Sequence, residues 1–208
     1  MTSELILLCL AAFAAGFIDA IVGVGGLIQT PAGLVLLPQY SVATVIGTLK
    51  IPAFSGTALA SLQYMQKIKI KWKLMILMTV LAFASAATGS FLLSKVDNHF
   101  MKPVLLGILI LVAAYTFTKK DFGTHTEKDH SLKEQFIYAA VISIVIGFYD
   151  GFIGPGAGSF LVLAFITLLG FDFKKASAHA KLVNLSTNLG SIMFFIGTGR
   201  IKRSYNNT

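Results

Sequence analysis

Two glycine-rich stretches, Gly23-Val24-Gly25-Gly26 and Gly154-Pro155-Gly156-Ala157-Gly158, each interrupt a long apolar run in the 208-residue sequence. Glycine and proline release a helix from its regular hydrogen bonding, so each stretch predicts a break between two helices. Inside a membrane, free backbone amides and carbonyls are tolerated only where protein buries them or where they line a watery cavity. The two breaks are therefore expected to lie at the centre of the fold.

The composition is that of a membrane protein. Hydrophobic residues make up 55% of the sequence and charged residues only 12%, whereas an average soluble domain has about 25% charged residues. The mean hydropathy is +0.77. These values exclude a soluble globular domain, a disordered chain and a nucleic-acid-binding module. The net charge of +8 comes mostly from short basic runs between apolar stretches, which is typical of the cytoplasmic loops of membrane proteins.

The apolar runs predict eight helical segments around the two breaks. They are residues 5–22, 27–37, 42–65, 74–93, 104–117, 136–153, 160–169 and 176–196. A helix that crosses a bilayer needs about 20 apolar residues, so segments 27–37 and 160–169 are too short to cross alone. We therefore predict an all-α polytopic membrane protein with glycine-broken, short or re-entrant helices.

A shift of 131 positions superimposes the two halves of the chain. It places Asp19 on Asp150, Lys50 on Lys181 and the first glycine motif on the second. Charged residues are costly inside a membrane and glycine is conformationally special, so these coincidences indicate a two-fold internal repeat. The first transmembrane repeat is expected at 1–118, a polar connecting loop at 119–134 and the second repeat at 135–208. Because the sequence ends where two further helices of the second repeat would begin, we expect that repeat to be incomplete.

The lysines indicate a binding site. Lys50 and Lys181 lie inside predicted helices, where a charge costs about 2.5–3.5 kcal/mol, so each is expected to face a cavity or a partner. Short helices interrupted at matching places in two halves mark the binding sites of many transporters, and a helix N-terminus favours an anion. Two alternatives stay open: the lysines reach an interface or pair with Asp19 and Asp150, and the glycines serve only close helix packing.

Polar residues near the lysines complete the candidate site. Asn184 and Asn188 follow Lys181 at helical spacing and form one polar stripe. The predicted substrate-binding residues are Lys50, Lys181, Gly25, Gly26, Gly156, Gly158, Thr48, Asn184, Ser186 and Asn188. The candidates for proton coupling are His179, whose charge changes near neutral pH, together with Asp19 and Asp150.

No cofactor is expected. The four histidines lack the spacing of metal ligands, Cys9 is the single cysteine, and no nucleophile–base pair is recognisable. The sequence therefore predicts no metal site and no enzymatic reaction.

At these motifs the chain resembles the sulfite exporter TauE/SafE family of bacterial inner-membrane transporters, in its branch of probable membrane transporter proteins. The resemblance covers nearly the whole chain. It rests on the first glycine motif, on Gly47-Thr48-Leu49-Lys50, on Ala180-Lys181 with Asn184 and Asn188, and most specifically on 154–160. Leu49 stands where the family often has asparagine. The resemblance implies export or exchange of small anions, with sulfite and organosulfonates as the substrates of better-known relatives.

The sequence and the resemblance together predict a secondary transporter in the cell membrane, an exporter or exchanger of a small anion such as sulfite or an organosulfonate, coupled to protons. Its partners would be the anion and the lipid bilayer, with a homo-oligomer as an option and no nucleic acid. The alternative is a truncated membrane protein without transport activity that acts only as an assembly partner, because the second repeat is expected to lack two helices.

Overall fold

The computed structural model describes residues 2–22, 25–118 and 131–199, and no strand occurs among them. The helices are α1 (Thr2–Val22), α2 (Gly26–Leu36), α3 (Val42–Lys67), α4 (Trp72–Lys95), α5 (Asn98–Thr118), α6 (Leu132–Phe152), α7 (Ala157–Leu169) and α8 (Phe173–Gly197). Each coincides with one of the predicted segments, so the all-α prediction is confirmed. Gly23 and Val24, most of the predicted connecting loop (119–130) and the basic tail (200–208) lie outside the described residues.

The outer surface of the bundle is apolar. Within the described residues, α3, α4, α5 and α6 are long and apolar enough to cross a membrane. Large apolar side chains point outward from these helices; Val80 is 62% exposed and Ile110 65% exposed. The helices that follow the two breaks are much shorter, with 11 residues in α2 and 13 in α7. The chain is therefore a multi-pass membrane protein that contains two short helices besides the longer ones.

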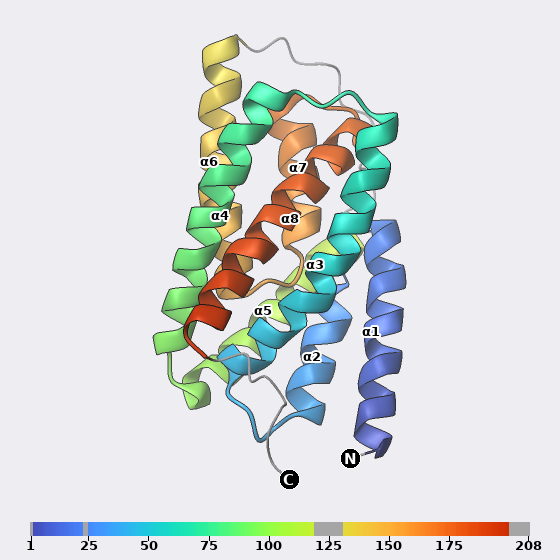
Figure 1. The fold of residues 1–208 in the computed structure, drawn as a ribbon, viewed down its shortest axis with the longest axis vertical. Helices are drawn as coiled ribbons and strands as arrows, with labels where there is room; N and C mark the ends of the chain where they lie inside the picture. Colours follow the sequence, from blue (N-terminus) through green and yellow to red (C-terminus); the bar gives the residue numbers. More distant parts are fainter. Residues whose placement is uncertain (1, 23–24, 119–130, 200–208) are drawn as a thin grey trace.

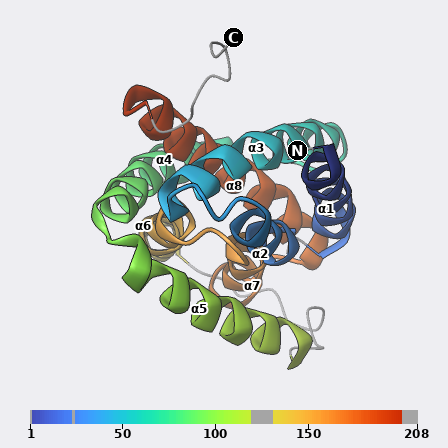
Figure 2. The ribbon, with the colours of Figure 1, turned by 90° about the horizontal axis from the view of Figure 1, so that it is seen from below.

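The two broken hairpins enter the molecule from opposite ends (Figure 1). The hairpin of α1 and α2 has its outer ends at the bottom of the view, and the hairpin of α6 and α7 has its outer ends at the top. The breaks meet in the middle, where a Cβ placed on Gly26 would lie only 3.0 Å from the Cα of Pro155. Seen from below, α8 lies in the interior and α5 runs along one edge (Figure 2).

Small residues let α4 approach its neighbours closely. A Cβ on Gly151 of α6 would collide with the carbonyl of Ala86, and one on Gly190 of α8 would collide with the carbonyl of Phe83. Helices in a bilayer associate through such close contacts because lipid removes the hydrophobic driving force between them. The glycines thus set the spacing of α4, α6 and α8.

Side-chain caps fix where three helices begin. Ser41, Ser131 and Asp172 precede α3, α6 and α8, and each side chain accepts a hydrogen bond from the amide three residues further on. A cap of this kind satisfies one of the unpaired amides of the first helical turn. At the other end of α7, Gly170 has a φ of 65°, in the left-handed region that favours glycine.

Candidate functional site

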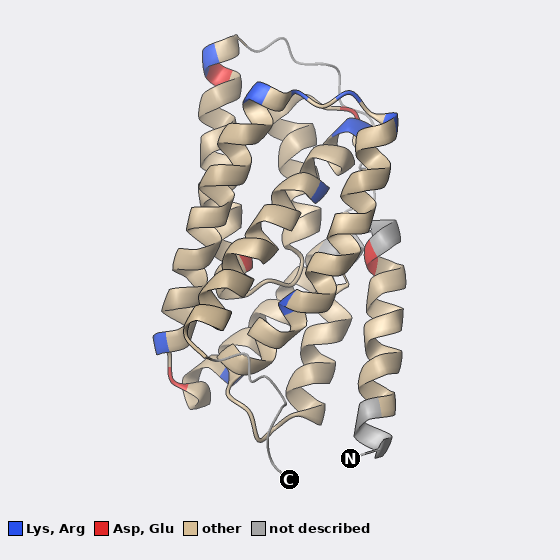
Figure 3. Cartoon of the chain, in the orientation of Figure 1, with Lys and Arg blue, Asp and Glu red and all other residues tan. Residues whose placement is uncertain are grey.

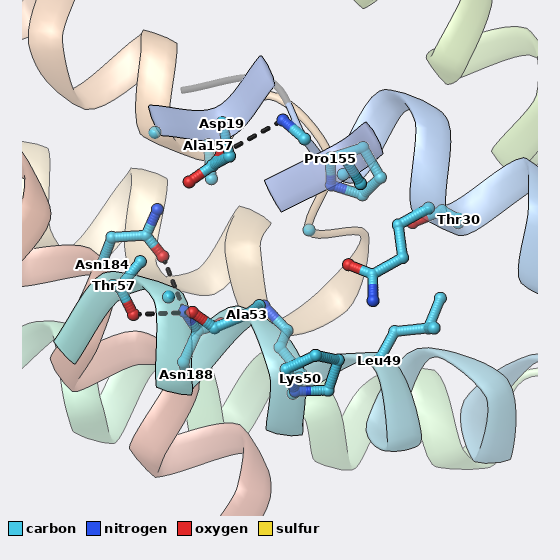
Figure 4. A pocket seen from close by; sticks show the side chains of 18 of the residues that line it. Asp19, Thr30, Leu49, Lys50, Ala53, Thr57, Pro155, Ala157, Asn184 and Asn188 are labelled. Atoms are coloured by element: carbon cyan, nitrogen blue, oxygen red, sulfur yellow. Dashed lines mark hydrogen bonds between the residues drawn. The ribbon is translucent and has the colours of Figure 1, made fainter. Parts of the chain in front are cut away.

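A cavity of about 150 Å³ lies between the two helix breaks. A single water molecule needs roughly 10–15 Å³ by the same measure, so the cavity has room for a small anion with some of its water. Most of the predicted site residues line it. They are Asp19, Gly25, Gly26, Lys50, Asp150, Gly156, Gly158, Lys181, Asn184 and Asn188. Figure 4 shows part of this lining.

Two predicted binding residues lie outside the cavity lining. Thr48 is exposed, and its hydroxyl donates to the carbonyl of Thr44 at 2.8 Å. The hydroxyl of Ser186 donates to the carbonyl of Thr79 at 2.7 Å and so joins α8 to α4. The structure therefore does not bring these hydroxyls together with the lysines.

His179 also lies outside the lining and is held by the protein on both ring nitrogens. Its Nδ1 is 2.7 Å from the carbonyl of Lys175, and its Nε2 is 3.3 Å from the amide of Lys71. A carbonyl only accepts and an amide N–H only donates, so these bonds select the neutral ring with its proton on Nδ1. In this position His179 connects the α3–α4 loop to α8.

Two ion pairs join the halves of the chain in the cavity wall. The Lys50 ammonium lies 2.8 Å from the Asp150 carboxylate and 2.7 Å from the Asp150 carbonyl. The Lys181 ammonium lies 2.7 Å from the Asp19 carboxylate and 3.2 Å from the Asp19 carbonyl. Each lysine thus binds the aspartate of the other half of the chain: Lys50 of the first half binds Asp150 of the second, and Lys181 of the second half binds Asp19 of the first. Pairing with the aspartates, one of the alternatives left by the sequence, is present in the structure.

The two pairs differ in their surroundings. The side chains of Lys50 and Asp150 are 6% and 5% exposed, whereas those of Lys181 and Asp19 are 11% and 30% exposed. Asp19 also accepts the amide of Gly25 at 3.1 Å, but the Oδ2 atom of Asp150 is buried without a partner among the described residues. A buried acceptor without a donor costs about 1–3 kcal/mol, so this oxygen favours a water, a proton or a ligand donor.

Two lysines and two aspartates are the charged residues among the described ones that line the cavity, so their formal charges cancel. Its capacity to hold an anion therefore depends on uncharged hydrogen-bond donors. The side-chain oxygen of Asn184 accepts a hydrogen bond from the side-chain amide of Asn188 at 3.0 Å, and the side-chain NH₂ of Asn184 donates to no described residue. Figure 4 shows Asn184 and Asn188 beside Thr57. Within the described chain, the first-turn amides of Gly26 in α2 and Gly158 in α7 also make no hydrogen bond. Such amides at a helix N-terminus are suited to an oxyanion.

Three further polar side chains line the cavity, namely Gln29, Thr30 and Thr57. The predicted binding residues did not include them. The 131-position shift superimposes Thr57 on Asn188, and this equivalence could have added Thr57 to the set. It superimposes Gln29 on the apolar Phe160, so the repeat carries no signal for Gln29. The available signal was that Gln29 and Thr30 are polar side chains on a short helix that follows a break.

Comparisons with known proteins match the chain to one family and to relatives named as membrane transporters. Residues 8–205 match the family described as Sulfite exporter TauE/SafE. A "Probable membrane transporter protein ORF9" from Sinorhizobium sp is 36% identical over 195 residues, which cover 93% of this chain and 73% of the relative. A "Probable membrane transporter protein" from Haemophilus influenzae is 36% identical, covering 94% and 75%. "Probable membrane transporter protein YfcA" from Escherichia coli K12 is 34% identical, covering 97% and 74%. No solved structure matches the chain.

Proposed function

Because the chain belongs to the sulfite exporter TauE/SafE family of membrane transporters, we propose that it carries a small anion, such as sulfite or an organosulfonate, through the cavity between its two helix breaks. One observation carries this proposal: glycines of both breaks, Lys50, Lys181 and the amide donors that have no partner among the described residues line the same cavity. Converging polar groups in a concave site are the general mark of a small-molecule site. The proposed location is the cell membrane, where the protein acts as an exporter or exchanger.

The neutrality of the cavity supports coupling to protons. An anion that enters a neutral site inside the membrane leaves a buried net charge, which is strongly unfavourable. If Asp19 or Asp150 takes up a proton with each negative charge, the site stays neutral and the paired lysine becomes free to bind the anion. We therefore assign the coupling to these two carboxylates, and the gradients of anion and protons set the direction of net flux.

The two-fold repeat, with units at 1–118 and 135–208, is part of the same proposal. The crossed ion pairs and the opposed entry of the two hairpins (Figure 1) support it. In transporters, two such halves move against each other around a fixed central site. Each half would then open the cavity to one side of the membrane.

The test is sulfite flux into proteoliposomes that contain the full chain, with and without a pH gradient. Thr57 and Ser55 form a matched pair on α3, because each hydroxyl bonds the carbonyl four residues earlier, at 2.8 and 3.1 Å. Only Thr57 lines the cavity. We expect Asn184→Ala to lower flux by about tenfold, the effect of one lost hydrogen bond, and Thr57→Ala to lower it by less, because the Thr57 hydroxyl already donates to the Ala53 carbonyl. Ser55→Ala should transport as the parent chain does.

Equal flux in all these variants would contradict the cavity as the binding site. The same conclusion would follow if the double variant Lys50→Ala/Lys181→Ala kept the flux of the parent. A chain that inserts correctly but moves neither sulfite nor organosulfonates in either direction would instead favour the alternative, an assembly partner without transport activity.

A further inference from the structure

Lysines gather at one end of the bundle, the upper end in Figure 3. Seven described lysines lie there, at the end of α3, in the α3–α4 loop and at the starts of α4, α6 and α8: Lys67, Lys69, Lys71, Lys73, Lys133, Lys174 and Lys175. The described acids at this end are Glu134 and Asp172, and both cap helices. At the other end, Lys95 ends α4, Asp97 lies in the α4–α5 turn and Lys102 lies near the start of α5. The charge of the described chain is therefore strongly uneven along the bundle axis.

Contacts around Lys71 join these segments into one surface. Its ammonium lies 3.1 Å from the side-chain oxygen of Gln135 on α6, and its amide donates to His179 on α8. The ammonium also lies 5.3 Å from the centre of the Phe171 ring, which Lys175 approaches at 4.8 Å. Cations at these distances are attracted to the face of an aromatic ring. The α3–α4 loop and the starts of α6 and α8 are therefore packed together.

Three other lysines of this surface have no ion-pair partner among the described residues and can bind a ligand. Lys67, Lys69 and Lys73 are exposed and form no ion pair within the described chain. Lys67 and Lys69 line a groove of about 580 Å³ over residues 65–70, together with Trp72. Trp72 is the only tryptophan of the sequence and is 55% exposed. Tryptophan is enriched at the level of the lipid headgroups, so the groove is expected to lie at that level.

We propose that this groove binds the phosphate groups of anionic phospholipids through Lys67 and Lys69. Directly along α4 from the groove, Ile76 and Val80 are 61% and 62% exposed and would contact the acyl chains. Each lysine near an anionic lipid surface raises the affinity by about fivefold. Since short lysine-rich loops lie on the cytoplasmic side, the surface also orients the chain with its α3–α4 loop inside the cell.

Trp72 makes the proposal directly measurable, because its fluorescence reports on this groove alone. The full chain is reconstituted in phosphatidylcholine vesicles that contain lipid brominated near the headgroup, which quenches the indole on contact. We expect brominated phosphatidylglycerol to quench Trp72 several-fold more than brominated phosphatidylcholine at the same mole fraction. The variant Lys67→Gln/Lys69→Gln should lose this preference. The matched variant Lys95→Gln/Lys102→Gln, with one lysine at the end of α4 and one near the start of α5, should keep it.

Equal quenching by the two lipids in the parent chain, or an unchanged preference in Lys67→Gln/Lys69→Gln, would overturn the proposal. The phosphate that the groove binds could belong to a lipid headgroup or to free inorganic phosphate. Adding millimolar inorganic phosphate at constant ionic strength distinguishes the two. A preference that survives its addition supports lipid, and a preference that disappears indicates a free-phosphate site. Helical circular dichroism of both double variants, and an intermediate preference in Lys69→Gln alone, guard against a folding artefact.

Discussion

The Lys50 ammonium binds Asp150 twice, through the carboxylate at 2.8 Å and through the main-chain carbonyl at 2.7 Å. Asp150 lies two residues before the end of α6, where the last carbonyls of a helix have no intrahelical partner and carry partial negative charge. Lys50 thus binds a carboxylate and a helix C-terminus together. Lys181 binds Asp19, near the end of α1, in the same way. Lys50 therefore stabilises the end of α6, just before the second break, and Lys181 stabilises the end of α1, just before the first break.

The more buried ion pair, Lys50–Asp150, should contribute more to the free energy of unfolding than Lys181–Asp19. Asp150→Asn leaves the Lys50 charge buried, and removing one partner of a buried pair costs about 3–5 kcal/mol. Asp19→Asn should cost less, because the Asp19 side chain is 30% exposed and water can replace it. Thermal unfolding of the detergent-solubilised chain measures both. An Asp19→Asn variant that is destabilised as much as Asp150→Asn would contradict this ranking.

Lys181 and Asp19 should behave as one energetic unit. Asp19→Asn leaves an uncompensated lysine, so adding Lys181→Gln to it should restore part of the lost stability. A double-mutant cycle should give a coupling energy of about 1 kcal/mol or more, the range for residues in direct contact. Additive effects of the two substitutions would show that the pair contributes nothing to stability.

The second break should depend on glycine at position 156. Gly156 has a φ of 84°, and a Cβ there would collide with the Val112 side chain. Left-handed backbone alone costs about 1–2 kcal/mol for a residue with a Cβ, so Gly156→Ala should lower the midpoint of thermal unfolding clearly. A methyl group added at Gly107 of α5 would meet nothing within 4 Å, so Gly107→Ala should be neutral or slightly stabilising. Similar midpoints in both variants would contradict the role of the left-handed turn.

His179 is expected to act in stability and not in proton movement. His179→Ala removes the bonds to Lys71 and Lys175, so it should lower the unfolding temperature. The dependence of flux on the pH gradient should stay that of the parent chain. Asp19→Asn should change this dependence, because the proposed proton acceptor is lost. If His179→Ala changed the dependence of flux on the pH gradient, His179 would take part in proton coupling.

Membrane orientation is measurable by cysteine labelling in intact cells. Cys9→Ser removes the only native thiol. On this background Gln66→Cys lies at the lysine-rich end and Gln39→Cys at the opposite end, and both positions are exposed. A membrane-impermeant maleimide should label position 39 from outside and position 66 only after permeabilisation. The reverse pattern would place the lysine-rich surface outside the cell.

The helices and most of the site were predictable because both follow local patterns. Each helix follows an apolar run, and each break follows a cluster of glycine and proline. On α8, Lys181, Asn184 and Asn188 line the cavity at positions three and seven apart, which is one face of a helix. Ser186 is five positions from Lys181 and therefore faces α4. Strict use of helical spacing would have excluded it.

The pairing of charges could not be predicted in the same way. The sequence shows that Lys50 and Lys181 each need a partner, but an aspartate is present in both halves. Only the opposed entry of the two hairpins decides that Lys50 meets Asp150 and Lys181 meets Asp19. The Oδ2 atom of Asp150, which has no partner in the described part of the chain, is likewise a product of the packing and not of any sequence motif.

The two ion pairs join residues that are made at different times during synthesis of the chain. Asp150 follows Lys50 by 100 residues, and Lys181 follows Asp19 by 162 residues. At about 5–20 residues per second, Lys50 leaves the ribosome about 5–20 s before its partner exists, and Asp19 waits about 8–30 s. During this interval the first half holds unpaired charges that each cost about 2.5–3.5 kcal/mol in lipid. This cost favours keeping α1 and α3 beside water or the insertion machinery until α6 and α8 arrive, so we expect the early helices to reach their final positions in the bilayer only after the later ones are made.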